Sequence, residues 1–502
     1  MSTEIVSLQT NKIITLLHSE EKKRRSEALK QILNLMKSNQ SKESSEWSGV
    51  KECNESTKHS SFNSSELWDS ISKPLLRILN DPVEECRDLT LEILQLFLKD
   101  SPPDDKYINY LFPILNRRLG SSEQIETSEE VRLKSVLLIK TIINKYEELL
   151  STYVDDLTSI LINTAKDNYP IIKKESCESI QMFAKCLTRL FYYQSKNFVK
   201  PVLVNFSHQH YRVRSVAVKT IGEIIQFGDG KLVEEVAQPL AERLFDQNGI
   251  VRKAVIEVAG SWLLKLRDRY SWWHRIIPLL LTGLHDELEE IRMRSAELWK
   301  QVGLQYMKEN ETDEKLKDKM DFLTENLPHY PKVMRPNLGC RTIAQQSFGK
   351  LLNGMILELS DWIADIRVRT AQLLCVFVLH LEEDITQHIG KILGPMYRAC
   401  NDEDKRVVEN LERACEYMGY FVLPQTYFSL IVPTLEENLS VGHLRVFSSI
   451  LKGSERSKLK PFLKDVAHFL AQPHICQSRS GEYQKELLAC CSSLISACDE
   501  VR

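Results

Sequence analysis

The residue types and spacings that could do chemistry are few, and each has a structural explanation. The segment Gly228-Asp229-Gly230-Lys231 resembles part of a phosphate-binding loop. That motif requires glycine at position 225 and Ser or Thr at position 232, where this chain has Ile and Leu. Because the segment follows a helical pattern, we interpret it as the turn that ends a helix, where glycine supplies a positive φ.

No candidate metal or catalytic site in the sequence has all the ligands or catalytic residues that it would need. His208 and His210 are spaced as a metal-binding pair would be, but a third and a fourth ligand are missing at a usable spacing. The twelve cysteines are scattered without a Cys-x-x-Cys pair, and the signatures of hydrolases, zinc proteases and kinases are absent. We therefore predict no catalytic residue, no cofactor, no metal ligand and no enzymatic activity.

The charge balance and the apolar pattern exclude several kinds of partner. The 66 Lys and Arg residues nearly balance 69 Asp and Glu residues, whereas a protein that coats nucleic acid is strongly basic. The longest apolar run covers only residues 373–379, and a spanning helix needs about 20 residues. With free cysteines and no secretory leader pattern, the sequence predicts a cytoplasmic protein without nucleic-acid, membrane or small-molecule partners.

Prolines and arginines recur with a period near forty residues, which predicts a repeat architecture. The gaps are 39, 88, 38, 39, 117 and 38 residues, where 88 is twice 44 and 117 is three times 39, and they separate Pro74, Pro113, Pro201, Pro239, Pro278, Pro395 and Pro433. An arginine follows most of these prolines by 11 to 14 residues, and an acid often stands between them. Lys173 takes the arginine's place between Arg132 and Arg214.

The segments between these markers have the apolar spacing of paired helices. Val251, Val255, Val258 and Trp262 lie on one face of a helix, and the unit before them repeats the spacing. Two helices alone cannot bury such faces, so neighbouring pairs must stack. The acid in the turn is expected to cap the second helix of each pair.

This pattern resembles the HEAT repeat. The resemblance implies an all-α fold without a sheet, a right-handed α-solenoid of about eleven HEAT repeats in the armadillo-like helical superfamily. In that family the turn acid and the arginine form a hydrogen-bonded ladder between neighbouring repeats. That structural role falls here to Asp81, Arg87, Arg132, Arg214, Asp246, Arg252, Asp286, Arg292, Arg367, Asp402 and Arg406.

Two insertions interrupt the period. Ten serines in 29 residues predict that residues 38–66 are disordered. Residues 308–346 begin with a charged run and continue with three prolines, which predicts an extended segment laid along the solenoid. The expected organisation is an N-terminal HEAT unit at 1–37, the insertion 38–66, HEAT units 2–7 at 67–307, the insertion 308–346, and HEAT units 8–11 at 347–502.

Several longer stretches of sequence indicate which HEAT-repeat family this protein resembles. Gln226–Lys231, Gly260–Ser271, His329–Pro331, Arg335–Arg341 and Ala471–Cys476 are similar to those of the HEAT-repeat dynein axonemal assembly factors. The Arg335–Arg341 stretch is the most specific, because solenoid packing does not require it. The resemblance implies a cytoplasmic role in the pre-assembly of outer and inner dynein arms for ciliary motility. The implied partners are axonemal dynein heavy or intermediate chains, chaperones and other assembly factors, with no catalytic residue and no cofactor.

The expected partner-binding residues come from this stretch and from the second helices. The aromatic cluster near Tyr270 is interpreted first as core, with a binding groove as the sharper alternative. Lys253 and Arg294 lie beside the ladder arginines and are predicted to be free for a partner. The full set is Lys253, Trp272, Trp273, Arg294, Arg335, Leu338, Cys340 and Arg341.

Other HEAT-repeat scaffolds remain alternatives, since a fold does not settle a function. A tubulin-binding array would present basic turns, but the turns at Asp81, Asp246 and Asp286 are acidic or neutral. A nuclear transport receptor or a phosphatase scaffold would share the fold and differ in its partners.

Overall fold

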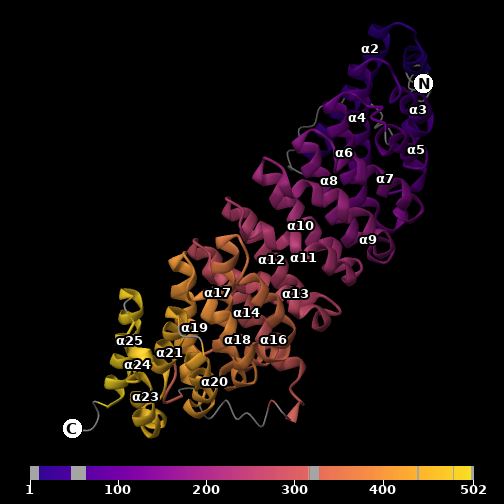
Figure 1. The fold of residues 1–502 in the computed structure, drawn as a ribbon. Coiled ribbons are helices and arrows are strands. Elements are labelled where there is room, and N and C mark those ends of the chain that lie inside the picture. Colours follow the sequence, from indigo (N-terminus) through magenta and orange to yellow (C-terminus); the bar gives the residue numbers. More distant parts are fainter. Residues whose placement is uncertain are drawn as a thin grey trace. The chain divides into compact units, whose positions relative to one another are not determined.

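The structure is a computed structural model, and it describes residues 11–46, 64–121, 123–314, 316, 327–437, 440–478 and 480–498. Every regular element in these ranges is a helix (Figure 1), so the predicted all-α fold is confirmed. Among the described helices, none combines the length and the apolar character that crossing a membrane requires. The chain divides into two compact units, Met1–Arg243 and Leu244–Arg502.

The first unit consists of helix pairs joined by short turns. Short 3₁₀ segments at Asp105–Tyr107, Glu147–Tyr153, Val204–Ser207 and Gly230–Leu232, and a π-turn at Asn116–Gly120, connect some of them. The α-helices are α2 (Lys22–Glu46), α3 (Ser64–Ile78), α4 (Glu84–Asp100), α5 (Leu111–Leu115), α6 (Glu129–Tyr146), α7 (Val154–Thr164), α8 (Pro170–Cys186), α9 (Thr188–Leu203), α10 (Tyr211–Phe227) and α11 (Val233–Arg243).

The second unit repeats this construction. Its α-helices are α12 (Gly249–Lys265), α13 (Arg269–Thr282), α14 (Glu289–Glu309), α16 (Leu338–Glu358), α17 (Ala364–Leu381), α18 (Ile389–Ala399), α19 (Lys405–Phe421), α20 (Pro424–Glu437), α21 (Val441–Gly453), α22 (Arg456–Leu459), α23 (Leu463–Leu470), α24 (Pro473–Cys476) and α25 (Gly481–Cys498). Its 3₁₀ segments are Gly283–His285, Glu382–Gln387 and Lys460–Phe462.

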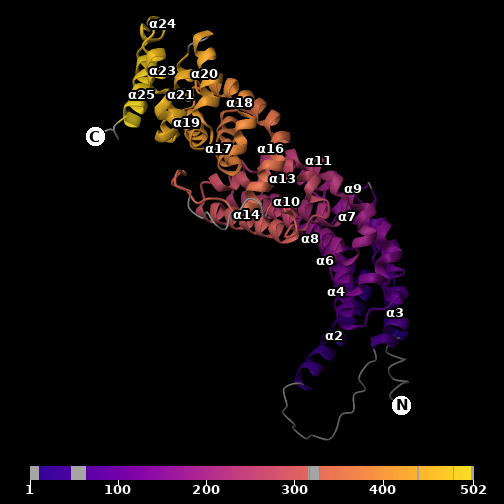
Figure 2. The same ribbon diagram turned by 90° about the horizontal axis from the view of Figure 1, so that it is seen from below.

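The helices of each unit lie in two rows. In the first unit, α2, α4, α6, α8 and α10 pack side by side, and α3, α5, α7 and α9 form the other row (Figures 1 and 2). The recurring prolines lie inside helices of this other row, which are the first helices of the pairs, as Pro74 does in α3 and Pro201 in α9. Proline lacks an N–H and bends a helix, so its recurrence marks the same helix of each pair.

The core lies between the rows. In α12 the predicted apolar face is buried, and Trp262 is fully enclosed. The adjoining faces of α12 also bury Ile256 and Ala259, because this helix contacts both α13 and α14. Stacked pairs thus bury what a single pair would leave exposed.

The insertions differ from their expected bounds. Helix α2 continues to Glu46, so residues 38–46 are helical, and residues 47–63 lie outside the described residues. Helix α16 already begins at Leu338 because Asn337 caps it, its side chain accepting from the Cys340 amide at 2.8 Å. Residues 338–346 therefore belong to a packed helix, and residues 315 and 317–326 lie outside the described range.

The Pro-bearing segment before α16 lies along the ends of later helices. The His329 ring stacks on Tyr420 of α19 at 4.4 Å between centroids, and its Nε2 lies 2.9 Å from the Gly453 carbonyl oxygen at the end of α21. Tyr330 packs edge-on against Phe421 at 5.6 Å. A repeat ordinarily contacts its neighbours alone, so this segment adds contacts between helices far apart in the sequence.

A buried histidine joins α14 to α17. The Trp299 indole N–H donates to His380 Nε2 at 2.8 Å, and His380 Nδ1 lies 2.6 Å from the Val376 carbonyl oxygen. Both bonds form together only when the imidazole is neutral with its proton on Nδ1. Burial lowers the pKa of His380 from 6.5 to about 4, and burial together with Arg413 lowers the pKa of His285 to about 4.

These lowered pKa values predict a loss of stability in acid. Between about pH 4 and pH 6.5 the unfolded chain binds more protons than the folded chain, so stability is complete above pH 6.5 and falls toward pH 4. His380→Gln removes one titrating ring and keeps an acceptor for Trp299. From pH 7 to pH 4.5 we expect the unfolding free energy of the unchanged protein to fall by about 2 kcal/mol more than that of the variant, measured by urea unfolding. An equal fall in the unfolding free energy of both proteins would contradict a buried, neutral His380.

Candidate functional site

The ladder arginine ties one inter-helix turn to the next. Arg252 donates from Nε to Asp286 Oδ2 at 2.7 Å and from Nη2 to Oδ1 at 2.9 Å, a two-pronged ion pair. Its Nη1 donates to the Asp246 carbonyl oxygen at 2.8 Å, in the turn before its own helix. Asp286 Oδ1 also accepts from the Leu288 amide at 2.9 Å, so the same carboxylate shapes the turn that begins α14.

The same geometry recurs in both units. Each arginine binds the carboxylate of the next turn through Nε at 2.6 or 2.7 Å and through Nη2 at 2.9 or 3.1 Å. Each of these carboxylates accepts from an amide two residues further on at 2.8 or 2.9 Å. These pairs are Arg25–Asp81, Arg132–Asp167 and Arg367–Asp402.

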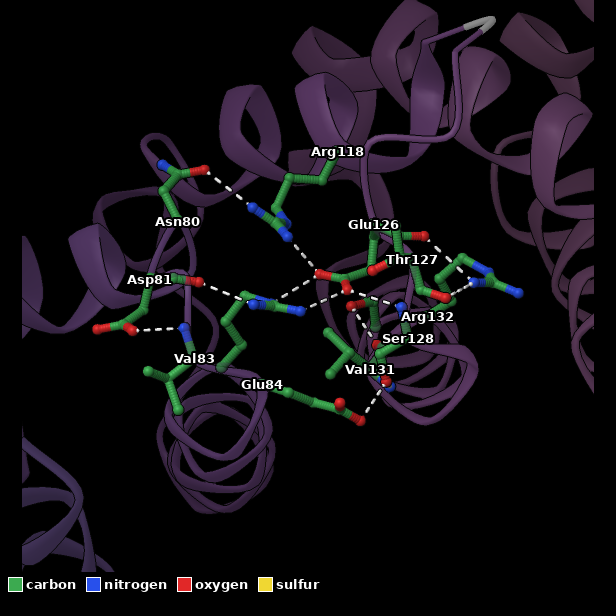
Figure 3. A network of polar contacts seen from close by, with 12 residues as sticks. Asn80, Asp81, Val83, Glu84, Arg118, Glu126, Thr127, Ser128, Val131 and Arg132 are labelled. Carbon is green, nitrogen blue, oxygen red and sulfur yellow. Dashed lines mark hydrogen bonds and ion pairs between the residues drawn. The ribbon is translucent and has the colours of Figure 1, made fainter. Parts of the chain in front are cut away.

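A glutamate replaces the aspartate at one turn, where a second arginine joins it (Figure 3). Arg87 binds Glu126 through Nε at 2.9 Å and Nη2 at 2.8 Å, and Arg118 pairs with the same carboxylate. Only 1% of the Glu126 side chain is exposed. Burial alone would raise the pKa of this carboxyl, but the hydrogen bonds from Arg87, Arg118 and the Ser128 amide outweigh it and lower the pKa.

Sequence spacing explains which arginines join the ladder. A ladder arginine donates from Nη1 to the carbonyl oxygen of the turn residue six positions before it. This spacing is found at Arg87, Arg132, Arg252 and Arg367. Arg214 and Arg292 have the same spacing and hold the carbonyls of His208 and Asp286. Lys173 takes the arginine's position, and its partner is a neutral amide instead of a carboxylate. Its Nζ donates to Asn205 Oδ1 at 2.9 Å.

Arg406 requires a correction. It follows Asp402 by four residues, and the buried Val408 holds the ladder position. The Arg406 side chain is 58% exposed and pairs with Asp404 at 2.8 Å and Asp365 at 3.1 Å. Glu126 and Asp167 also belong to the ladder, since each precedes by six residues the basic residue of the next helix, Arg132 and Lys173.

The residues of the most specific stretch lie inside the fold. Arg335 and Arg341 both pair with Glu382, at 2.7 and 2.9 Å, which fixes the start of α16 against the segment after α17. Cys340 Sγ donates to the Trp299 carbonyl oxygen at 3.1 Å, and burial raises the pKa of its thiol to about 12. Leu338 is half-buried in the first turn of α16. Arg335, Cys340 and Arg341 thus act within the fold, which corrects their expected role as a partner contact.

The two cations expected to be free are paired. Lys253 forms an ion pair with Glu290, and Arg294 binds Glu257 through Nε at 2.7 Å and also pairs with Glu297. These acids come from α12 and α14, the same neighbouring second helices that carry the cations. The second helices therefore hold these two cations in ion pairs with their own acids, and neither is free as expected.

The aromatic cluster is packed and also lines a cavity. Trp273 is 6% exposed and meets Tyr270 edge-on at 4.5 Å and Tyr306 at 5.6 Å, while Trp272 is half-buried. The core interpretation thus holds for Trp273. A cavity of about 330 Å³ adjoins it between α13, α14 and α16, and its lining residues are Tyr270, Trp273, His274, Tyr306, Asn310, Gln346, Ser347 and Lys350.

Polar contacts order the walls of this cavity. Gln346 donates from Nε2 to Tyr306 Oη at 3.1 Å, and Tyr270 donates from Oη to Glu309 Oε2 at 2.7 Å. Glu309 also pairs with Arg269 and accepts from Gln305 at 2.7 Å. Burial would raise the pKa of Glu309, but these bonds outweigh it and lower the pKa. That carboxylate is therefore ionised and fully engaged.

The described residues hold no cluster of three or more His, Cys, Asp or Glu side chains suited to a metal ion. The candidate site is a surface of stacked helix pairs with an ordered aromatic cavity.

Two family models together cover most of the sequence. One, described as "Dynein axonemal assembly factor 5-like, TPR repeats", matches residues 16–319. The other, described as "Dynein axonemal assembly factor 5, HEAT-repeat domain", matches residues 328–501. The chain belongs to the dynein axonemal assembly factor 5 family. The resemblance inferred from the sequence is thereby confirmed, and the ladder occurs in both matched regions although the first is described as TPR repeats.

Members of the dynein axonemal assembly factor 5 family from distant animals align with most of this protein. The proteins of that name from Xenopus laevis and Homo sapiens are each 39% identical, over 85% and 86% of this chain and 51% of their own length. The Drosophila melanogaster protein is 29% identical over 80% of this chain and 48% of its own. The chain thus spans about half the length of these curated relatives.

Solved structures of low sequence identity are similar to the fold. An engineered protein has a TM-score of 0.40 at 13% identity, over 97% of this chain and 99% of its own. The crystal structure of Kap121p has a TM-score of 0.39 at 12% identity, over 99% of this chain and 46% of its own.

The ladder geometry predicts a large difference between two ion pairs. Asp286→Ala leaves the buried Arg252 side chain, which is 11% exposed, without its counter-ion, and should lower the free energy of unfolding by about 3–5 kcal/mol. Arg406→Met, which removes an exposed pair, should cost less than about 1 kcal/mol. Urea unfolding followed by circular dichroism measures both.

A double variant tests whether the uncompensated charge is the cause. Arg252→Met together with Asp286→Ala leaves no buried charge and should recover much of the loss. A double variant as unstable as Asp286→Ala alone would show that the carboxylate acts mainly through the Leu288 turn.

Proposed function

We propose that this chain is a non-catalytic cytoplasmic scaffold for the pre-assembly of axonemal outer and inner dynein arms, and so serves ciliary motility. Its clients are axonemal dynein heavy or intermediate chains, which it holds together with chaperones and other assembly factors. The observation that carries the proposal is the membership of residues 16–319 and 328–501 in the dynein axonemal assembly factor 5 family.

The fold supports a scaffold. Stacked helix pairs present a long surface of many small contacts, which suits a large and partly folded client. Because ion pairs occupy Lys253 and Arg294, we place the principal client contact on α13, α14 and α16, where the aromatic cavity opens. In this proposal the connector between α14 and α16, residues 310–337, is a second contact with the client or a gate to the first contact.

Affinity capture from the cytosol of ciliating cells tests the proposal. We expect axonemal dynein subunits, together with chaperones, to be recovered with the protein and identified by mass spectrometry. Tubulin, transport cargo or phosphatase subunits without any axonemal dynein subunit would overturn it and leave one of the other HEAT-scaffold functions.

The connector can be tested separately. Removing residues 308–341 would delete the start of α16 with Cys340 and Arg341, so the informative variant replaces residues 311–326 by a Gly-Ser linker of equal length. We expect it to recover less dynein subunit while the protein stays folded. The same replacement at residues 48–63 is the matched control and should not change recovery. Equal recovery with both variants would show that the connector is only a spacer.

A further inference from the structure

One part of the chain carries an excess of positive charge. Residues 179–222 contain seven Lys and Arg residues and neither Asp nor Glu, although acids slightly outnumber Lys and Arg in the whole chain. These residues cover the end of α8, all of α9 and most of α10. Because surface charge of one sign attracts partners of the other sign, this part of the first unit is a candidate contact for an acidic partner.

Helix α9 gathers part of this charge in one line. Four exposed side chains are spaced by four, three and four residues, which places them on the same side of the helix. They are Arg189, Tyr193, Lys196 and Lys200, and together we call them the α9 face. Tyr193 is 79% exposed, and the half-exposed Tyr192 beside it meets its ring edge-on at 5.5 Å. The α9 face therefore combines three cations with an aromatic ring that is open to solvent.

The three cations of the α9 face are not neutralised within the described part of the chain. Lys185, from the same acid-free run, pairs with Glu223 at 2.8 Å, but these three form no ion pair with any described carboxylate. Asp155 of the neighbouring helix α7 accepts instead from the amide of Gln194 at 3.0 Å. The ion pairs that neutralise the second helices α12 and α14 do not extend to α9, which belongs to the other row.

The turn that follows α9 also lacks the ladder carboxylate. At other turns an aspartate accepts from the amide two residues further on, whereas here Nδ1 of His208 accepts from the His210 amide at 3.1 Å. Lys173 is 8% exposed, and its hydrogen-bond partner is the neutral side chain of Asn205. Burial and the positive charge of Lys173 lower the pKa of His208. The positive charge at this end of α9 therefore lacks the compensation that Asp286 gives at its own turn.

The flanks of the α9 face limit what can bind there. Helix α9 lies between α7 and α11 (Figures 1 and 2), and these helices carry the exposed acids Asp155, Glu234 and Glu235. A nucleic acid or an anionic membrane spreads negative charge over a wide surface, which these acids would repel. A single protein segment is narrow enough to lie along one helix, and arginine and tyrosine are favoured at protein interfaces.

We propose that the α9 face binds an acidic segment of a partner protein, whose carboxylates pair with the three cations and whose apolar atoms lie on Tyr193. At a rise of about 1.5 Å per residue, Lys196 and Lys200 are about 6 Å apart along the helix, and Arg189 is about 10 Å before Lys196. A partner helix with acids one and two turns apart matches these distances. This surface is additional to the client contact that we place on α13, α14 and α16.

Labelled peptides added to the full chain test the proposal, with fluorescence anisotropy as the readout. Three peptides share a helical Ala-Leu background and differ at three positions, one and two turns apart, which hold glutamate, glutamine or lysine. A labelled oligothymidylate and vesicles of phosphatidylserine and phosphatidylcholine are the other probes. We expect the glutamate peptide to bind, with an affinity that falls as salt is added, and the glutamine and lysine peptides not to bind.

Variants assign the binding to the α9 face. Lys196→Gln with Lys200→Gln should weaken binding of the glutamate peptide about five- to tenfold. Lys73→Gln with Lys99→Gln, at exposed lysines of α3 and α4, is the matched control and should not change it. Lys196→Glu with Lys200→Glu should abolish binding of the glutamate peptide and allow the lysine peptide to bind, because the charges of both sides are then exchanged.

Three results would overturn the inference: no binding of the glutamate peptide at low salt, equal binding of the glutamate and glutamine peptides, or unchanged affinity in the two lysine-to-glutamine substitutions on α9. Tighter binding of the oligothymidylate or of the vesicles, lost in the same variant, would also overturn it and identify a nucleic acid or a membrane as the partner. Because the peptides are added to the isolated protein, these results are independent of whether dynein subunits are captured from cells.

Discussion

The buried arginine–carboxylate pair between successive turns is the constraint on which the rest of the structure depends. A buried ion pair adds little net stability over an apolar contact of the same shape, but it is costly to break. Its value lies in geometry, because a two-pronged pair such as Arg252–Asp286 allows one distance and one orientation between neighbouring turns. The same aspartate also shapes the turn that starts the next second helix. Register within each unit is thus set turn by turn, while apolar burial provides the driving force.

Because so many arginines form internal ion pairs, few cations on the surface are available to a partner. The ladder engages most arginines at the turns, and cross-helix pairs such as Arg294–Glu257 neutralise the cations beside them. Recognition by a continuous basic stripe would need cations that these acids already hold. The aromatic cavity differs, because the carboxylate of Glu309 is satisfied next to it while Trp273 Nε1 and Lys350 have no such partner among the described residues.

Much of the fold could be predicted from the sequence, because a forty-residue period in proline, arginine and apolar residues has few structural solutions. The ladder was foreseeable in its general form, but its members depend on a six-residue spacing that places Val408 where Arg406 was expected. The start of α16 was missed because Asn337 caps it inside a stretch interpreted as an insertion. The cavity could not be foreseen, since Tyr270, Tyr306 and Lys350 come from three helices and no spacing within one helix connects them. The stretch Arg335–Arg341 is characteristic in sequence, but spacing alone does not show that both of its arginines form ion pairs with Glu382 inside the fold.

In the function that we propose, a dynein subunit contacts α13, α14 and α16 of this protein. Lysine-directed cross-linking of the complex captured from ciliating cells, followed by mass spectrometry, tests this most directly. The exposed lysines Lys300, Lys308 and Lys350 lie on α14 and α16, and Lys350 lines the cavity, whereas Lys37 and Lys106 lie in the first unit. The account predicts that cross-links to an axonemal dynein subunit concentrate on the first three. Cross-links confined to the first unit would contradict it.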